Sequence, residues 1–203
     1  MKHYVIQDKD GRTHVHWELD GVTANMIDWF WCNIEKCNYN QHSKMKFEWM
    51  EGHGVKEKNC PLDAVYSMTQ EWYDGSEIRS YLRIETLNHI PEQMKELIRY
   101  DHVVALGGIS LFGNDVQPDG PAFAWRLHQW QKTDNGVMGI TSAYTKPGSS
   151  VESGQTWANQ IIDKLRDWEQ NLAETYRSYM LNSKDKNTDV FSFKVTEQMK
   201  YCL

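Results

Sequence analysis

The stretch SGQTWANQIIDKLRDWEQNLAETY, residues 153–176, is the longest segment of the sequence with helical periodicity. Its large apolar residues recur every three or four positions, at Trp157, Ile161, Leu165, Trp168, Leu172 and Tyr176. Side chains at this spacing share one face of an α-helix. We therefore predict a long amphipathic helix that opens at Ser153 and whose apolar face is covered by another layer of the protein.

The residues before this helix alternate in the manner of β-strands. Asp-Gly turns at residues 8–11, 74–75 and 134–136 are typical of hairpins. The first hairpin lies within residues 1–20, and the later strands are predicted at 45–50, 65–73, 78–86, 102–112, 122–131 and 137–145. Two shorter helices interrupt them, one over 24–35 with Thr23 as its N-cap and one over 91–98 with Pro91 in its first turn.

An antiparallel meander of about seven strands, interrupted by short helices and closed by one long helix, is an α+β arrangement. The order of elements is that of the helix-grip (START-like) fold, in which a curved sheet wraps around the last helix and encloses a cavity. We expect one domain over residues 1–181. Residues 182–203 turn to Ser, Lys, Asp and Asn, and we expect an extension that forms a short terminal strand or a partly ordered tail.

Charge and composition exclude several classes of function. The 203 residues carry a net charge of -6, which disfavours a surface built to neutralise nucleic-acid phosphates. The N-terminus has no apolar signal region, and no stretch reaches the roughly 18 apolar residues that a membrane span requires. We therefore expect a cytoplasmic protein with no nucleic-acid or membrane partner. Its four cysteines form no CxxC pair and are expected to be reduced thiols, at Cys32, Cys37, Cys60 and Cys202.

The sequence is rich in aromatic residues, with 9 Trp, 10 Tyr and 6 Phe. Large aromatic side chains line either a packed core or a small-molecule cavity. The candidates for contact with a small-molecule substrate are Trp29, Tyr73, Tyr81, Trp130, Trp157 and Trp168.

Residues 20–42 resemble a known enzyme family. Asp20-Gly21-Val22-Thr23, then Met26-Ile27-Asp28-Trp29-Phe30-Trp31 and Tyr39-Asn40-Gln41-His42, are similar to the motif of the diacetylphloroglucinol hydrolase and phloretin hydrolase family. The resemblance implies a helix-grip fold and hydrolysis of a carbon–carbon bond beside a ketone on a phenolic ring, a retro-Claisen type reaction that depends on zinc.

The resemblance also implies metal ligands. His42 matches the first zinc ligand of the family, and Glu71 matches the second. The family's His-x-x-x-Glu pair falls near Lys164 and Trp168 of this chain, and neither residue type ligates zinc. A bound zinc ion and the absence of a cofactor therefore both stay open.

Four polar residues are candidates for acid–base or electrostatic catalysis: His42, Glu71, Arg126 and His128. His42 lies in a loop, where functional groups are common. Glu71 becomes a general acid or base if its strand face is concave, and is otherwise an exposed strand carboxylate. Arg126 and His128 share a strand face and could polarise a carbonyl or hold a phenolate, or else form a polar patch on the exterior.

The run His14-x-His16-x-Glu18 is a further candidate. Alternate residues of a strand project to one face, so that two imidazoles and a carboxylate are placed together as metal ligands are. A solvent-facing polar surface, or a structural hydrogen bond, is the alternative interpretation. His102 and the pair Tyr81 and Arg83 are candidates of the same kind.

Three hypotheses for function follow. The first is an enzyme that acts on a hydrophobic phenolic or polyketide-like molecule, by resemblance a C–C bond hydrolase. The second is a metal-independent cyclase, isomerase or pericyclase of natural-product biosynthesis, which folds its substrate and polarises one carbonyl. The third is a non-catalytic protein that binds a hydrophobic ligand. The sequence leaves the formation of a homodimer open.

Overall fold

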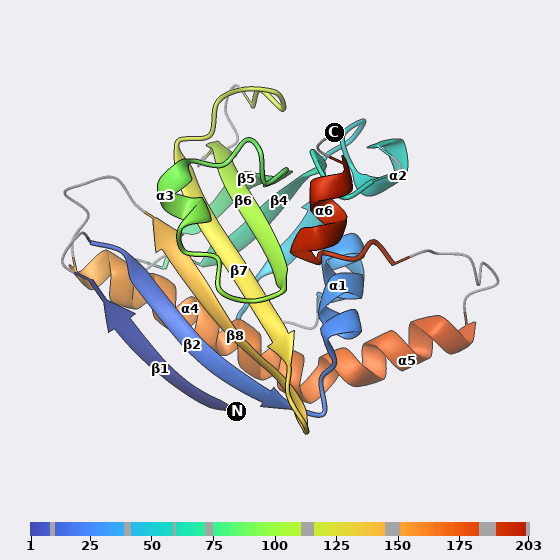
Figure 1. Cartoon of the computed structure of the whole chain (residues 1–203). Coiled ribbons are helices and arrows are strands. Elements are labelled where there is room, and N and C mark those ends of the chain that lie inside the picture. The colour runs from blue at the N-terminus through green and yellow to red at the C-terminus, as the bar shows by residue number, and fades with distance from the viewer. Residues whose placement is uncertain are drawn as a thin grey trace.

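The computed structural model describes residues 1–8, 11–38, 42–58, 60–71, 75–110, 116–144, 151–182 and 190–201. Within these ranges eight strands form one antiparallel sheet, in the order β1-β2-β8-β7-β6-β5-β4-β3 (Figure 1). Their bounds are β1 Lys2–Gln7, β2 Thr13–Asp20, β3 Lys46–Trp49, β4 Val65–Glu71, β5 Glu77–Glu85, β6 His102–Ser110, β7 Ala124–Lys132 and β8 Gly136–Tyr144. Strands β3 to β8 pair in chain order, and β8 then pairs with β2.

The helices follow the predicted pattern, with two additions. Their bounds are α1 Ala24–Cys32, a short 3₁₀ turn at Ile34–Lys36, α2 Val55–Lys58, α3 Glu92–Lys95, α4 Val151–Asp167, a π-helical turn at Trp168–Leu172, α5 Ala173–Asn182 and α6 Val195–Tyr201. Thr23 caps α1, and its hydroxyl accepts a hydrogen bond from the Met26 amide at 3.3 Å. The short helix α2 lies between the strands predicted at 45–50 and 65–73, where no helix was predicted.

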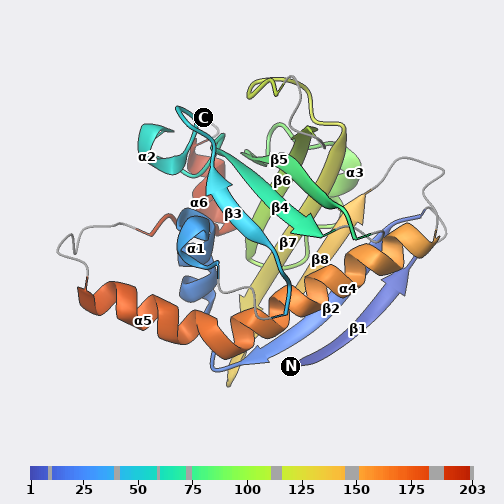
Figure 2. The ribbon, with the colours of Figure 1, turned by 180° about the vertical axis from the view of Figure 1, so that it is seen from behind.

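The long C-terminal helix lies across the concave face of the sheet. Figure 2 shows α4 crossing this face, while α5 leaves the sheet and reaches α1. The helix changes direction at the π-helical turn, where one extra residue per turn interrupts the regular hydrogen-bond pattern. The protein therefore has the helix-grip fold that its sequence predicts. No helix among the described residues is long and apolar enough to cross a membrane.

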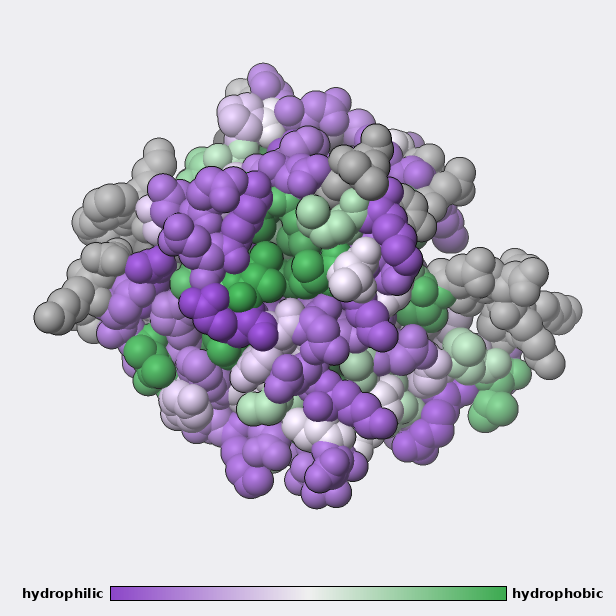
Figure 3. All heavy atoms as spheres, in the orientation of Figure 1, coloured by the Kyte–Doolittle hydropathy of each residue, from purple (hydrophilic) through white to green (hydrophobic). Residues whose placement is uncertain are grey.

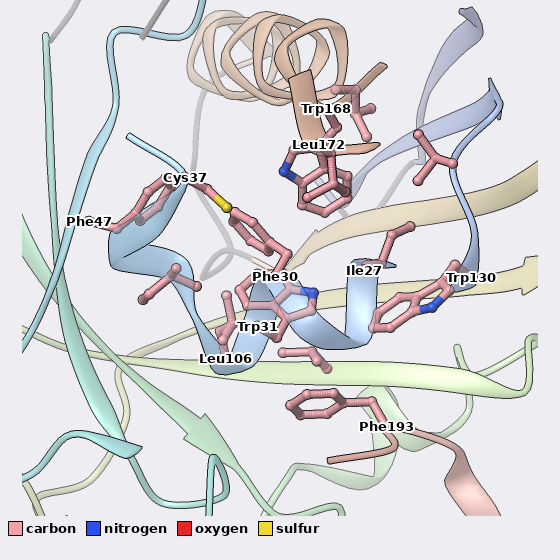
Figure 4. Packing of buried hydrophobic residues seen from close by; sticks show 14 of the residues in the cluster. Ile27, Phe30, Trp31, Cys37, Phe47, Leu106, Trp130, Trp168, Leu172 and Phe193 are labelled. Carbon is pink, nitrogen blue, oxygen red and sulfur yellow. The ribbon is translucent and has the colours of Figure 1, made fainter. Parts of the chain in front are cut away.

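An aromatic contact fixes the long helix on the sheet. The ring of Trp168, in the π-helical turn, packs edge-on against Phe30 at 4.8 Å, Trp31 at 6.4 Å and Trp17 at 6.3 Å between ring centres. Figure 4 shows this cluster, with Trp168 and Leu172 of the helix facing Phe30 and Trp31 of α1. Burial of such large side chains stabilises the fold by several kcal/mol, on the order of 2 kcal/mol for each.

A second, smaller cluster lies on the opposite face of the sheet. It consists of Leu87, Ile90, Met94, Val103, Ala105 and Leu127. Strand β6 is thus buried on both faces, because Val104 and Leu106 belong to the main core. Figure 3 shows apolar side chains at the bottom of a hollow on this side of the molecule.

For the C-terminal segment we expected a short strand or a partly ordered tail, and its described residues 190–201 end in a helix instead. Lys194 makes an isolated bridge to His102, but residues 195–201 are the helix α6. The helix is anchored by Gln198, which lies fully buried and donates to the carbonyls of Val103 and Phe193. Cys32, Cys37 and Cys60 form no disulfide among the described residues, and Cys202 lies outside them.

The pairing of β2 with β8 predicts a sensitive glycine. Gly139 lies opposite Trp17, and a Cβ atom there would lie 2.1 Å from Cζ2 of the indole. We expect Gly139→Ala to lower the free energy of unfolding by about 1–3 kcal/mol, because the indole must move. Gly108→Ala is the matched control, since its Cβ would meet no atom closer than 3.5 Å. Urea unfolding of both variants tests the prediction, and equal stability of the two would contradict it.

Candidate functional site

A cavity of ≈ 780 Å³ lies between the sheet and α4. Its volume is within the range of about 300–1,000 Å³ that is typical of small-molecule sites. Most of its wall is apolar and aromatic, with Phe30, Trp31, Phe47, Tyr66, Trp157 and Trp168 among the lining residues. The cavity is therefore suited to a hydrophobic ligand of drug-like size.

Three of the described lining residues are of the basic types Arg, His and Lys, and Arg126 is the first of them. It comes from the middle of β7, and its guanidinium lies 5.4 Å from the ring centre of Trp157 on α4. Its Nη1 donates to the carbonyl of Trp125 at 2.8 Å. Burial lowers the pKa of Arg126 to about 10, so the side chain remains a cation at neutral pH. A guanidinium here is a permanent donor to an oxygen atom of a ligand.

His128 lies two residues further along the same strand face and also lines the cavity. Burial, with the field of Arg126, lowers the pKa of His128 to about 3, so the imidazole is neutral at physiological pH. Its Nδ1 lies 3.3 Å from the Thr141 hydroxyl, which accepts a hydrogen bond from the Trp17 indole at 3.1 Å. The Thr141 hydroxyl can then donate its own hydrogen to Nδ1, and we assign the imidazole proton to Nε2 on this basis. Neutral His128 is a donor rather than an acid.

Lys164 faces the cavity from α4. Only 7 % of the residue is exposed, and its Nζ lies 4.7 Å from the ring centre of Phe47 and 5.3 Å from that of Phe30. The ammonium donates to the Cys37 carbonyl at 3.5 Å. Burial lowers the pKa of Lys164 to about 8, against the opposing fields of Cys37 and Asp167. Lys164 can therefore hold or release a proton close to physiological pH.

None of the described residues that line this cavity is an aspartate or a glutamate. Two cationic side chains and a neutral imidazole consequently share an apolar space with no carboxylate in its wall. Charges interact strongly in such a space because water screens them little. The wall is complementary to a ligand oxygen that carries or develops negative charge.

The structure places only some of the predicted aromatic residues in this wall. Tyr81, Trp157 and Trp168 line the cavity, whereas Tyr73 lies outside the described residues. Trp29 and Trp130 are completely buried in the core instead. Trp29 packs on Tyr176 and Tyr179 of α5, and Trp130 packs on His102 and Phe193. The periodicity of the sequence did not distinguish these core residues from cavity residues, because both kinds of residue face the interior of the protein.

Glu71 does not enter the cavity. Strand β4 turns Met68 and Gln70 toward the cavity, so that alternation directs Glu71 to the opposite face. Its carboxylate is half exposed and accepts a hydrogen bond from Lys44 Nζ at 2.7 Å. The expectation of a desolvated acid or base at this position is wrong, because the face that carries Glu71 is the convex one.

His42 is held by a buried aspartate. Its backbone amide and its Nδ1 lie 3.0 and 2.9 Å from Oδ1 of Asp167, and Ser43 donates twice to Oδ2. Burial alone would raise the pKa of Asp167, but these hydrogen bonds from Ser43 and His42 lower it below its usual range. His42 thus fastens the loop before β3 to the end of α4 and does not line the cavity.

These residues do not fit the zinc ion that the resemblance implies. His42 and Glu71 do not line the cavity, and Glu71 lies on the opposite face of the sheet, where it accepts a hydrogen bond from Lys44. The helix positions of the other two ligands carry Lys164 and Trp168, whose side chains are not zinc ligands. We therefore derive no chemical step through a metal in this cavity.

The other predicted histidines have structural partners. His14 contacts Ser142 at 2.8 Å and His16 stacks on Tyr4 at 4.5 Å, both on the face of β2 away from the core. His102 is buried and paired with Asp28 at 3.0 Å. Tyr81 and Arg83 share a face of β5, as expected, because the pairing of β5 with β4 runs without a shift through both residues. Tyr81 borders the cavity, and Arg83 pairs with Glu85.

Lys164 lines the cavity but was not predicted as a ligand-binding candidate from the sequence. The resemblance marked position 164 only as one where the family carries a metal ligand and this chain carries a lysine. The signal lay in its spacing, because Lys164 follows Trp157 and Ile161 and precedes Trp168 on the apolar stripe of the long helix. A lysine within such a stripe is buried and needs an explanation.

Comparison with known proteins supports the fold. No protein-family definition matches the sequence, and no curated protein matches it. The structure is similar to a protein from Rhodobacter sphaeroides, with a TM-score of 0.53, 9 % identity and coverage of 85 % of this chain and 99 % of that chain. It is also similar to protein Ms6760 from Mycobacterium smegmatis, with a TM-score of 0.50, 13 % identity and coverage of 89 % and 96 %.

A third solved structure with a similar fold is that of the di-domain ARO/CYC StfQ from the steffimycin biosynthetic pathway. It has a TM-score of 0.45 and 11 % identity, with coverage of 85 % of this chain and 52 % of that chain. These likenesses show the helix-grip fold alone, and at its TM-score StfQ carries no argument about this chain. None of them places the protein in the diacetylphloroglucinol hydrolase family that its sequence resembles.

The environment of His128 predicts a loss of stability in acid. In the unfolded chain histidine binds a proton below about pH 6.5, whereas folded His128 stays neutral to about pH 3. The unfolded state therefore binds more protons between these values, and stability falls as the pH falls. From about pH 7.5 to about pH 5 we expect this group to cost on the order of 2 kcal/mol. Urea unfolding at both pH values should show a smaller loss for His128→Gln, and an equal loss in variant and wild type would contradict the assignment.

Proposed function

We propose that the protein is an enzyme that cyclises or isomerises a hydrophobic, carbonyl-bearing small molecule, phenolic or polyketide-like, in the cavity between the sheet and α4. The observation that supports the proposal is the charge of the wall. Arg126 and Lys164 are cations, His128 is a neutral donor, and the described lining residues include no carboxylate. Enolisation and ring closure next to a carbonyl develop negative charge on oxygen, and such donors stabilise that charge.

The three polar side chains have different tasks in this proposal. Arg126 is a permanent cation that holds the enolate or phenolate oxygen. His128 keeps its ring oriented through Thr141 and donates from Nε2. Lys164 is the acid–base group, because burial brings its pKa to about 8 and a proton can move at Nζ near neutral pH. The aromatic wall folds the substrate and excludes water, which favours reaction within the substrate over attack by water.

Turnover of acylphenols and linear poly-β-ketones, followed by mass spectrometry, tests this function. The proposal predicts products with the mass of the substrate or with one water lost in ring closure. Two fragments whose masses add up to that of the substrate plus one water would support the hydrolase instead, and binding without turnover would support a ligand-binding protein.

Two variants should separate catalysis from folding. We expect Arg126→Met and Lys164→Met each to lower kcat/KM by about 10²–10³, the range found when a donor to a developing oxyanion is removed. Lys132→Met removes an exposed cation of the same strand as Arg126 and is the matched control. Equal activity in all three variants would overturn the assigned roles.

The binding of an anionic ligand should depend on the charge of Lys164. Anilinonaphthalene sulfonate is an apolar fluorescent probe with a permanent negative charge. Since Lys164 loses its proton as the pH rises through about 8, we expect the affinity for the probe to fall by roughly tenfold over that range. In Lys164→Met the affinity should be low already at neutral pH and independent of pH. A pH dependence that persists in the variant would show that another group is responsible.

The cytoplasmic location, the possibility of a homodimer and the domain boundary at residue 181 stay predictions from the sequence.

A further inference from the structure

Three side chains of types that can ligate a metal ion lie together on the convex face of the sheet, away from the cavity. Asp63, Glu85 and His89 each offer one ligand atom, and these atoms all lie within 4.8 Å of one another. Leu82 and Ile84 of the same strand as Glu85 belong to the main core on the concave side. Alternation therefore directs the Glu85 carboxylate to the opposite face, so this cluster is separate from the proposed catalytic cavity.

The backbone holds the three residues in place. Asp63 lies in the turn before β4, and its amide donates to the Ile84 carbonyl at 2.7 Å. Glu85 is the last residue of β5, and His89 closes the turn that follows, with its amide 3.0 Å from the Thr86 carbonyl. The turn before β4 and the end of β5 are thus held side by side, and the three side chains point toward one another.

The environment of Glu85 indicates that this cluster binds a ligand. Its side chain is 1 % exposed, and its Oε2 has no hydrogen-bond partner among the described residues. A buried carboxylate oxygen without a partner costs free energy unless a cation or a donor reaches it. The other oxygen, Oε1, lies 2.6 Å from Nη2 of Arg83 and accepts a hydrogen bond from Nε of Arg83 at 2.9 Å.

The surroundings leave room for the carboxylate. A Cβ atom at Gly107 would lie 2.3 Å from Glu85 Oε1, so the glycine permits the carboxylate to approach β6. Arg83 is the one cation that the structure shows bonded to Glu85, and its Nη1 is also occupied by the carbonyls of Pro118 and Gly120. Asp63 brings a second carboxylate within 4.8 Å of the Glu85 carboxylate, so the cluster carries more negative charge than Arg83 alone balances.

We propose that Asp63, Glu85 and His89 bind a divalent transition-metal ion. One imidazole nitrogen with two carboxylate oxygens is a donor set suited to Zn²⁺, Mn²⁺ or Co²⁺ rather than to soft Cu⁺ or to Ca²⁺, which takes oxygen ligands. Water completes the coordination on the open side, where His89 is exposed. The ion joins the turn before β4 to the turn after β5, and it stabilises the fold without taking part in the chemistry of the cavity.

Titration of the full-length protein with Co²⁺ and Zn²⁺, after removal of metals with a chelator, tests the proposal. We expect one equivalent of Co²⁺ to bind with a visible absorption spectrum, Zn²⁺ to displace it, and the thermal midpoint to rise with metal concentration. Asp63→Asn and His89→Gln should each weaken Zn²⁺ binding by at least about 10–100-fold.

The variants are chosen so that folding is retained. Asp63 has a positive φ of 64°, a backbone conformation that asparagine also accepts, and His89 is exposed. His14→Gln is the matched control, because His14 lies 3.5 Å from a carboxylate oxygen of Asp8 in a different part of the protein. Failure of the wild type to bind one equivalent, or binding that survives both variants or is lost in the control, would overturn the site.

Discussion

The packing of Trp168 against Trp17, Phe30 and Trp31 is the contact on which the rest of the structure depends. It joins the long helix to strand β2 and to α1 at one point. On one side of this contact the helix continues with Leu172 into a filled core, which Figure 4 shows. On the other side Leu165, Ile161 and Trp157 line the cavity. The same apolar stripe therefore seals the core at one end and builds a binding space at the other.

The cavity keeps cations in an apolar space at a cost in free energy. Removal of a lysine or an arginine from water is costly, and the aromatic rings around Lys164 and Arg126 offset only part of that cost. The pKa values of Lys164, Arg126 and His128 are all lowered, chiefly by burial, which shows that their protonated forms are disfavoured in the cavity as it stands. A ligand with an anionic oxygen would relieve this penalty. Affinity for such a ligand and stabilisation of an enolate-like transition state have the same physical origin.

The sequence predicted the architecture because that depends on local patterns. The stripe from Trp157 to Tyr176, the hairpin turns and the Thr23 cap each follow from the spacing of a few neighbouring residues. The shared face of Arg126 and His128 was predicted for the same reason, since alternation along one strand is local. Which face of a strand is concave depends on the curvature of the whole sheet, and the sequence therefore could not decide between the two interpretations of Glu71.

Long-range pairings were beyond sequence reasoning. His42 meets Asp167 across 125 positions of the chain, and no periodicity links the two. Trp29 and Trp130 resemble cavity residues in the sequence but pack against α5 and Phe193, which lie far from them in the chain. The separate cluster of Asp63, Glu85 and His89 likewise arises only where two turns are brought together by strand pairing.

The ionisation of a phenol bound in the cavity tests the central claim most directly. A hydroxyacetophenone absorbs differently as phenol and as phenolate, so its pKa can be titrated optically in the bound state. An apolar cavity alone would raise this pKa, because burial penalises the charged form. The cationic wall of Arg126 and Lys164 predicts the opposite, a pKa lower than in water that returns upward in Arg126→Met. A bound phenol whose pKa is raised in the wild type would contradict the account.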